Sequence, residues 1–482
     1  MKIGFWFDYD QTYTFVEIFA WLAKRVPDAR ASGFVVNDRY FAHAAKHLPQ
    51  SALIRFYDLV NAGRNYSPTA DELRAFREFD ERERLARVAY SDRWIRTWSH
   101  RQLISLYVFL AKEFRGYIDR EKPDVFVFNC VASQYAHLFY LILREKGVRV
   151  LMPMLSGVED LTYFVDNPYL EWPDVVALFN GMKEGSAEPT PVERNWATEF
   201  IDRVRTGSAT YSITNAVKQE NRKFSMPGLT RVGSYFRYLN NYCRYDRYDP
   251  TLPSPVQRLR SVLRMRRARK EAVRYFRDIS AVGDRFLFYP LHYDPEISSL
   301  ILAQYEQASA IDIIVRQLPL SWRLVIKEHP ALVGQRPLSF YREIAERYPN
   351  AVFVDPAISA NALVRRASAV FTLSGTTILD ALILSRPVIY TSQSRLGAFG
   401  LGVFTHNLID FGAALSAAET KIATDAELTF MLSAIRRSCA RFKFAEPLGD
   451  LSVLDASNVE KMGNALLARV NVHDSTLSRA YA

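Results

Sequence analysis

The stretch VFTLSGTTILDALILSRPVIY, at residues 370–390, has the pattern that most clearly indicates the fold of this chain. It opens with an apolar run typical of a buried strand, turns through Ser-Gly-Thr-Thr, continues with apolar residues at helical spacing, and ends in a second apolar run. Strand, helix and strand in this order form the βαβ unit of a parallel sheet. The stretch therefore predicts a doubly wound α/β domain.

The same alternation continues on both sides of this stretch. Apolar runs predict strands at residues 2–7, 33–37, 124–129, 148–153 and 175–180 in the first half, and at residues 286–290, 323–327, 351–354, 369–373 and 387–391 in the second. Helical patterns lie between them, among them residues 72–88, 102–121, 134–146, 298–318 and 338–347. We therefore expect an α/β protein whose ligands bind at the carboxyl ends of parallel strands.

The pattern divides the 482 residues into four segments. A first Rossmann-like domain is expected at residues 1–186 and a basic, helical or irregular bridge at residues 187–280. A second, cleaner Rossmann-like domain is expected at residues 281–424, followed by C-terminal helices at residues 425–482. A chain of this length can give two such domains sizeable cores.

Composition excludes several classes of protein. With 49% hydrophobic and 24% charged residues, the chain is neither disordered nor collagen-like. Cys130, Cys243 and Cys439 lie far apart without histidines at ligand spacing, so neither a zinc site nor a disulfide framework is expected. The first residues do not resemble a signal peptide, and apolar runs of about nine residues are half of what a bilayer span needs. We expect a cytoplasmic protein without a bound metal.

The positive charge is concentrated in the bridge. Between residues 231 and 277 there are 13 Arg and Lys against three acids, which equals the net charge of +10 of the whole chain. Residues 257–277, QRLRSVLRMRRARKEAVRYFR, have the pattern of a basic amphipathic helix.

Three interpretations of this helix remain open. The first is a solvated connector, and the second is a contact with anionic lipid or an anionic acceptor. The third is a contact with nucleic acid, which is the least favoured because no nucleic-acid recognition motif accompanies the helix. The second interpretation rests on Arg264, Arg266, Arg267 and Arg269.

Four polar clusters of the second half each follow a predicted strand. They are residues 292–296 (HYDPE), 327–330 (KEHP), 374–377 (SGTT) and 392–395 (SQSR). Because parallel strands end at one edge of a sheet, we expect these clusters to converge on one site.

The cluster Ser374, Gly375, Thr376 and Thr377 is expected to bind an anion. Ser and Thr are typical caps of a helix N-terminus, whose free N–H groups attract phosphate, and Gly375 lets the backbone approach a ligand closely. Asp380, one helical turn later, is a candidate for accepting hydrogen bonds from ribose hydroxyls. The alternatives are an ordinary capped helix and a surface acid.

Two histidine-containing clusters complete the candidate site. In the first, Lys327, His329 and Pro330 end a strand, where an imidazole can donate a hydrogen bond to a leaving phosphate.

In the second, His292, Asp294 and Glu296 offer a base or a carboxylate nucleophile, unless the two acids only form the turn. Glu159 and Asp160, in the segment SGVEDLTYF at residues 156–164, are candidates for activating an acceptor. The alternative is that these two acids play no part in the chemistry.

Taken in order, YPLHYDPE, WRLVIKEHP, LSGTTILDAL and RPVIY resemble the capsule polysaccharide biosynthesis family of bacterial GT-B glycosyltransferases, which includes β-Kdo transferases. The resemblance covers about residues 285–394. The His-Pro and Ser-Gly-Thr elements are also similar to those of bacterial sialyltransferases. The resemblance implies a GT-B fold, in which two Rossmann-like domains face a central cleft.

By this resemblance, His329, Ser374 and Thr376 recognise the nucleotide of a CMP-sugar. Glu296 falls at the family's essential acidic position, and Asp294 stands where relatives often carry Gln. The implied reaction is metal-independent transfer of Kdo or another acidic sugar from a CMP-activated donor to a surface-polysaccharide or lipid-linked acceptor, without a cofactor.

The protein would then work in the cytoplasm, as a peripheral protein at the inner face of the inner membrane, and without nucleic acid. The open alternatives are a sugar-nucleotide epimerase of the same architecture and a non-catalytic assembly or export factor.

Overall fold

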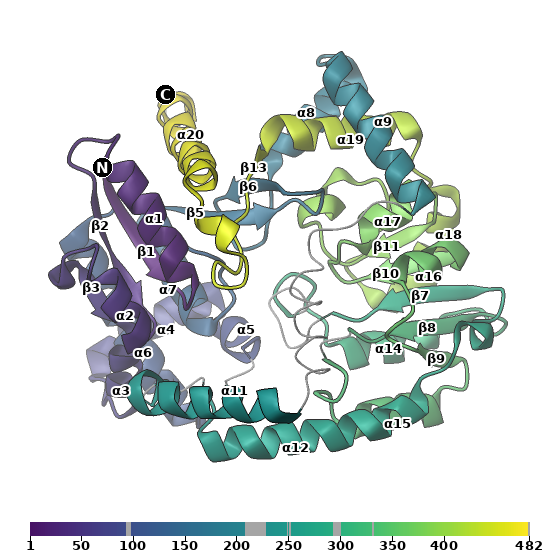
Figure 1. Ribbon diagram of the computed structural model, residues 1–482. Helices are drawn as coiled ribbons and strands as arrows, with labels where there is room; N and C mark the ends of the chain where they lie inside the picture. The colour runs from purple at the N-terminus through teal and green to yellow at the C-terminus, as the bar shows by residue number, and fades with distance from the viewer. Residues whose placement is uncertain are drawn as a thin grey trace.

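The computed structural model describes residues 1–92, 98–207, 228–247, 249, 252–292, 300–329 and 332–480. Within them the chain forms two sheets, each covered by helices (Figure 1). The prediction of two doubly wound α/β units is therefore confirmed.

The first sheet is built mainly from the N-terminal part of the chain. Its strand order is β13-β6-β5-β4-β1-β2-β3, and β1 to β5 pair in parallel, whereas β6 is antiparallel to β5 and to β13. The strands are β1 (Lys2–Phe7), β2 (Arg30–Val35), β3 (Leu53–Arg55), β4 (Val125–Val127), β5 (Arg149–Leu155), β6 (Leu161–Val165) and β13 (Ala440–Arg441).

The second sheet is entirely parallel, in the order β12-β11-β10-β7-β8-β9. This is the Rossmann order, in which the winding direction reverses between the first and the fourth strand, here β7 and β10. The strands are β7 (Phe286–Pro290), β8 (Arg323–Lys327), β9 (Ala351–Val354), β10 (Ala369–Thr372), β11 (Val388–Tyr390) and β12 (Val403–Phe404).

The helices connect and cover the strands. In the first part they are α1 (Gln11–Ala23), α2 (Asp38–Ala44), α3 (Phe56–Arg64), α4 (Ala70–Glu83), α5 (Leu85–Tyr90), α6 (His100–Glu121), α7 (Gln134–Glu145), α8 (Pro173–Glu184) and α9 (Pro191–Thr206). The bridge contributes α11 (Gly228–Asn241) and α12 (Pro255–Ala272). The remainder are α14 (Gln307–Val315), α15 (Leu338–Arg347), α16 (Ala360–Arg366), α17 (Thr377–Ile383), α18 (Phe411–Thr420), α19 (Asp425–Ser438) and α20 (Ala456–Ala480).

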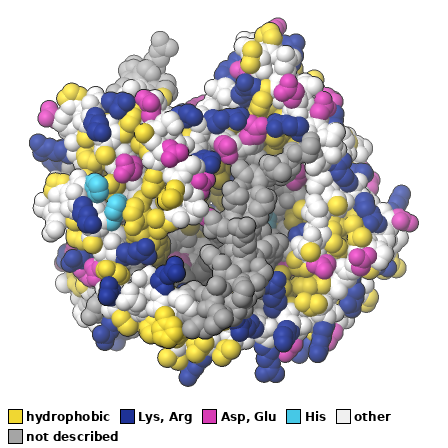
Figure 2. All heavy atoms as spheres, in the orientation of Figure 1, with side chains coloured by type: hydrophobic (Ala, Val, Ile, Leu, Met, Phe, Trp, Pro, Cys, Tyr) yellow, Lys and Arg dark blue, Asp and Glu magenta, His cyan; other side chains and the backbone are white. Residues whose placement is uncertain are grey.

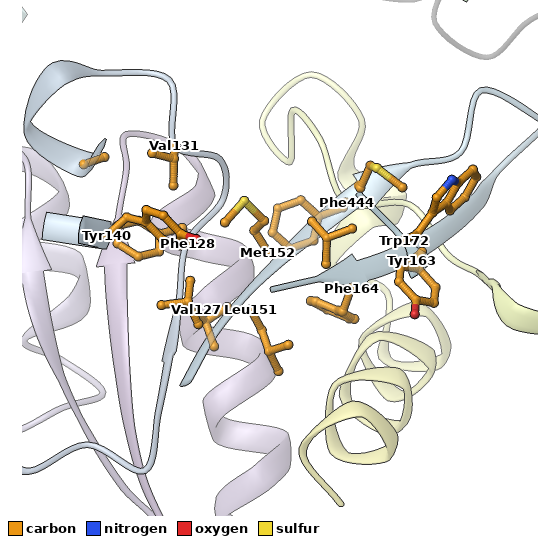
Figure 3. Packing of buried hydrophobic residues seen from close by; sticks show 14 of the residues in the cluster. Val127, Phe128, Val131, Tyr140, Leu151, Met152, Tyr163, Phe164, Trp172 and Phe444 are labelled. Carbon is orange, nitrogen blue, oxygen red and sulfur yellow. The ribbon is translucent and has the colours of Figure 1, made fainter. Parts of the chain in front are cut away.

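The chain returns to the first sheet after completing the second. β13 adds a strand beside β6, and α20 lies along α1, with Gly463 so close to Trp21 that a Cβ at this glycine would overlap the indole ring (Figure 1). Phe164 stacks on Phe442, and Phe444 reaches the core that β4 and β5 share (Figure 3). Burying each such ring contributes about 1.5–3 kcal/mol, so the C-terminal segment is part of the first domain's core.

Three predicted elements differ from the observed ones. Residues 175–180, expected as a strand, lie inside α8, because a short apolar run has no period that separates a buried strand from a helix. The helix expected at residues 72–88 is broken at Arg84, whose φ is 55°. Of the helix expected at residues 298–318, the described part forms only α14.

In the part of the chain that the structure describes, no helix combines the length and the apolar composition needed to cross a bilayer.

Candidate functional site

The reversal point of the second sheet brings His292 and Thr372 together. Both β7 and β10 are buried, and the two residues stand where these strands end. His292 Nε2 lies 3.1 Å from Thr372 Oγ1, which also accepts a hydrogen bond from the Gly375 N–H at 3.1 Å. Ligands of doubly wound sheets bind at this point, outside the carboxyl ends of the two strands.

The backbone of His292 is fixed by residues from two other elements. Its N–H donates to Gln307 Oε1 at 2.6 Å, and its carbonyl accepts from Gln307 Nε2 at 3.1 Å and from Arg336 Nη2 at 2.9 Å. Gln307 is completely buried at the start of α14. The imidazole is therefore held in place independently of any ligand.

Gly375 is required where the turn after β10 meets the imidazole. A Cβ at this position would lie 2.7 Å from Thr372 Oγ1, a distance that real Cβ atoms essentially never show, and 3.0 Å from His292 Cε1, which is tighter than most real contacts. The absence of a side chain at Gly375 leaves room for the His292 ring. The close approach of a ligand, expected from the sequence, stays a prediction.

Glu328 organises the second histidine cluster. It is fully buried, and its carboxylate accepts from Arg336 Nε, from the Tyr341 hydroxyl and from the His329 N–H, each at 2.8 Å. All these partners are directional, so Glu328 fixes Arg336 and the backbone of His329 together. The sequence analysis assigned no role to Arg336, because the local sequence pattern does not indicate that this residue pairs with Glu328, eight residues earlier.

The two imidazoles are uncharged and lie among cations. Burial, followed by the charges of Arg395, His329 and Arg336, lowers the pKa of His292 to about 4. Burial, Lys327 and Arg336 lower the pKa of His329 in the same way. A phosphate at this edge would be attracted by the cations and would raise the pKa of both imidazoles.

The turn before α17 differs in detail from its prediction. Thr376 occupies the N-cap position with φ −65° and ψ −12°, a helical geometry, and its side chain makes no capping hydrogen bond. α17 has only seven residues, so its dipole is small. Any anion at this turn would depend on the neighbouring cations. Ser374 is buried, whereas Thr377 and Asp380 are half-buried on the same turn and helix.

The first domain contacts this turn through residues 157–172. A Cβ on Gly157 would lie 3.3 Å from Thr376 Cγ2. The Arg395 N–H donates to the Leu170 carbonyl at 2.9 Å, and Trp172 Nε1 donates to the Arg395 carbonyl at 3.0 Å. The segment that holds Glu159 and Asp160 thus lies against the candidate nucleotide site.

Glu159 joins three segments of the chain. Its two carboxylate oxygens pair with Arg203 of α9 at 2.6 Å and Arg441 of β13 at 2.5 Å. Burial acts to raise the pKa of Glu159, but the two guanidinium groups prevail and lower it. A carboxylate paired in this way is a weak base. The geometry therefore favours a structural role for Glu159, in which it links α9 and β13. Asp160 is half-buried beside it.

A group that the sequence analysis missed stands at the corresponding point of the first sheet. Asp8 follows β1 directly, beside the reversal between β1 and β4. Burial, followed by the charges of Asp10 and Asp249, raises the pKa of Asp8 to about 7. The sequence contains a pattern that could have identified Asp8, because Asp8 and Asp10 directly follow the strand predicted at residues 2–7.

Asp249 comes from the bridge and lies on this edge. It is buried, and it accepts a hydrogen bond at 3.2 Å from the Tyr9 hydroxyl, which also lies 3.2 Å from the Tyr57 hydroxyl. Tyr9 has a φ of 44°, so the turn after β1 is tightly bent. Among the described residues, the first edge thus carries Asp8 and Asp249, whereas the second carries Lys327, Arg336 and Arg395.

Some predicted site residues are not placed. Asp294, Glu296 and Pro330 lie outside the described residues. Among the described residues, no group of three or more His, Cys, Asp or Glu is arranged to hold a metal ion.

Comparisons with known proteins identify similar solved structures only. No family model matches the chain, and no curated protein matches it. UDP-GlcNAc 2-epimerase from Neisseria meningitidis bound to UDP-GlcNAc is 10% identical, with 91% of this chain and 99% of that chain covered and a TM-score of 0.26. The β-Kdo 2,7 transferase KpsC from Thermosulfurimonas dismutans is 10% identical, with 66% and 79% covered and a TM-score of 0.31.

The glycotransferase of kitacinnamycin is 12% identical, with 91% of this chain and 95% of that chain covered and a TM-score of 0.27. Identities and TM-scores of this size identify neither a family nor an activity for this chain.

Proposed function

We propose that the protein is a glycosyltransferase that binds a nucleotide-activated sugar at the reversal point of its second sheet. The observation that carries this proposal is the His292–Thr372 pair with the charges of Arg336 and Arg395 close to His292, and with Lys327 close to His329. Glu328 is the acid in direct contact with Arg336, and its hydrogen bonds are already satisfied within the protein. Arginine and lysine side chains at this edge suit the phosphate of a nucleotide donor.

The donor we propose is a CMP-activated acidic sugar such as Kdo. Support comes from the motif resemblance, which assigns His329, Ser374 and Thr376 to the nucleotide. In this role a neutral imidazole donates a hydrogen bond to the phosphate as the sugar–phosphate bond breaks and negative charge develops on the leaving group. Glu296 is the carboxylate expected to attack the sugar or to assist its transfer.

The acceptor side of the reaction is assigned to the first domain. Asp8, with a pKa of about 7, is suited to take the proton of an acceptor hydroxyl near neutral pH and release it afterwards. The rate of transfer should therefore rise with pH up to about 7, and Asp8→Asn should remove this dependence. Asp71→Asn, on an exposed carboxylate of α4, is the control that should keep it.

Thermal-shift measurements with CMP, UDP, GDP and their sugars test the donor assignment. A ligand at 100 times its Kd contributes about 2.7 kcal/mol to the free energy of unfolding, which is readily measured. CMP should raise Tm, and His329→Ala should remove the rise. Stabilisation by UDP or GDP without CMP would overturn the choice of base.

Incubation with donor alone and with donor plus acceptor tests the reaction class. Transfer or slow hydrolysis of the donor supports a glycosyltransferase. Formation of an epimeric sugar nucleotide would assign the site to an epimerase instead, and an inert protein that binds donor would leave only an assembly role.

A further inference from the structure

The helix α12 has one side packed against the protein. Ala272 is buried, Arg258 lies over the Tyr238 ring of α11 with its guanidinium carbon 3.9 Å from the ring centre, and the Met265 carbonyl and Arg269 lie against Gly334. α11 and α12 run side by side along the lower edge of the molecule (Figure 1). The helix is therefore a fixed part of the surface.

Its opposite side carries an exposed apolar stripe. Val256, Leu259 and Leu263, spaced three and four residues apart and hence on one face, are each between 46% and 58% exposed. Phe236 of α11 and Val273 after α12 are exposed as well. Five of the 15 large hydrophobic side chains found exposed among the described residues thus belong to this short region. A clustering of this kind marks an interaction surface.

Cations flank the stripe. Arg260, Arg264, Arg266, Arg267 and Lys270 are all exposed, and helical spacing places Arg260 and Arg267 directly beside the apolar residues. The single acid of the helix, Glu271, pairs with Arg267 at 3.2 Å. Figure 2 shows hydrophobic and basic side chains next to each other along this lower edge.

We propose that this face of α12, which we call the docking face, binds the surface of an anionic lipid bilayer. The apolar stripe would enter the boundary between headgroups and acyl chains, and the guanidinium groups would contact lipid phosphates. Charge alone would also suit a nucleic acid, but an exposed leucine stripe would contribute nothing there. Arg269, which the sequence analysis grouped with Arg264, Arg266 and Arg267, is half-buried, and its backbone N and Cβ lie against Gly334.

Flotation with lipid vesicles tests the proposal on the full chain. The protein should bind vesicles that contain phosphatidylglycerol, bind phosphatidylcholine vesicles at least tenfold more weakly, and dissociate as salt is raised. Leu259→Ser with Leu263→Ser should weaken binding at least tenfold at low salt. The triple variant Arg260→Gln, Arg264→Gln and Arg267→Gln should lose the preference for anionic lipid. Each cation removed should lower the affinity for anionic vesicles about fivefold.

The control is Leu320→Ser with Ile409→Ser, which removes side chains that are 96% and 73% exposed in the second domain. This variant should bind vesicles like the parent protein. All variants should keep the parent Tm and the parent response to CMP, so that the docking face is tested separately from the nucleotide site.

Three results would overturn the proposal. The first is a parent protein that binds no vesicles, or binds neutral and anionic vesicles equally. The second is undiminished binding by the leucine variant. The third is a parent dimer that the leucine variant converts to a monomer without any effect on vesicle binding, since the face would then join two copies of this chain.

Discussion

The carboxyl edges of the two sheets share a topology and differ in the charge of their described residues. At the first edge, burial and the charges of Asp10 and Asp249 raise the pKa of Asp8. At the second edge, Lys327, Arg336 and Arg395 surround neutral imidazoles. The same winding reversal thus provides one place suited to a proton acceptor and another suited to a phosphate. The fold provides two possible sites, and the side chains at each site determine which chemistry it suits.

The largest expected effect concerns Glu296, the proposed catalytic carboxylate. Glu296→Gln should lower turnover by about two to four orders of magnitude while CMP affinity is retained, because the phosphate contacts that we propose involve other residues. Intact-mass spectrometry with donor alone should show a sugar adduct on the parent enzyme and none on the variant. Near-normal turnover of the variant would move the role to Asp294 or to the acids of the first edge.

The basic edge contains a buried ion pair between Arg336 and Glu328. Arg336→Leu leaves the Glu328 carboxylate buried without its cation and should lower the free energy of unfolding by about 3–5 kcal/mol. Denaturation in urea measures this loss. Arg74→Gln, which breaks an exposed pair with Asp71, should change it by less than about 1 kcal/mol. Equal effects of the two changes would show that the pair does not hold the edge together.

The contact between Gly375 and the His292 ring can be tested by adding a methyl group at Gly375. Gly375→Ala places a methyl group against the His292 ring and should destabilise the protein by about 1–3 kcal/mol. Gly116→Ala is the matched control: a Cβ there meets nothing within 4 Å, and alanine inside α6 should stabilise by up to about 1 kcal/mol. Opposite signs of the two changes in Tm are expected, and a neutral Gly375→Ala would contradict the packing described for the turn.

The smallest effect concerns the stability of the acidic edge. Because the pKa of Asp8 is about 7 in the folded protein and ordinarily 3.8, the folded state favours the protonated carboxyl. Its contribution to stability is complete below about pH 4 and is lost as pH rises towards 7. Asp8→Asn should therefore raise Tm by about 2–4 °C at pH 8 and leave it unchanged at pH 4. An equal change at both pH values would contradict the raised pKa.

Much of the fold was predictable, because buried parallel strands are continuous apolar runs. All six strands of the second sheet except the two-residue β12 lie within one or two residues of their predicted positions. β13 was not predictable, since two residues carry no periodicity and its partner β6 lies far away in sequence. The run at residues 175–180 was misassigned for the related reason that its length suits either structure.

The candidate site was predictable only where its residues follow strands. This rule identified His292, His329 and Ser374, and applied to β1 it would also have identified Asp8. Thr372 and Arg336 could not be found in this way, because their roles arise from contacts to His292 and Glu328 that only the folded chain creates.

Proton uptake on CMP binding measures whether the basic edge of the second sheet binds a nucleotide phosphate, as we propose. A bound phosphate raises the lowered pKa values of His292 and His329, so binding at pH 6 should take up protons, and affinity should increase as pH falls. Titration calorimetry in buffers of different ionisation enthalpy measures the uptake. We expect proton uptake by the parent protein and reduced uptake by His329→Ala. Failure of CMP to bind, or binding with the same uptake in His329→Ala, would contradict the proposal.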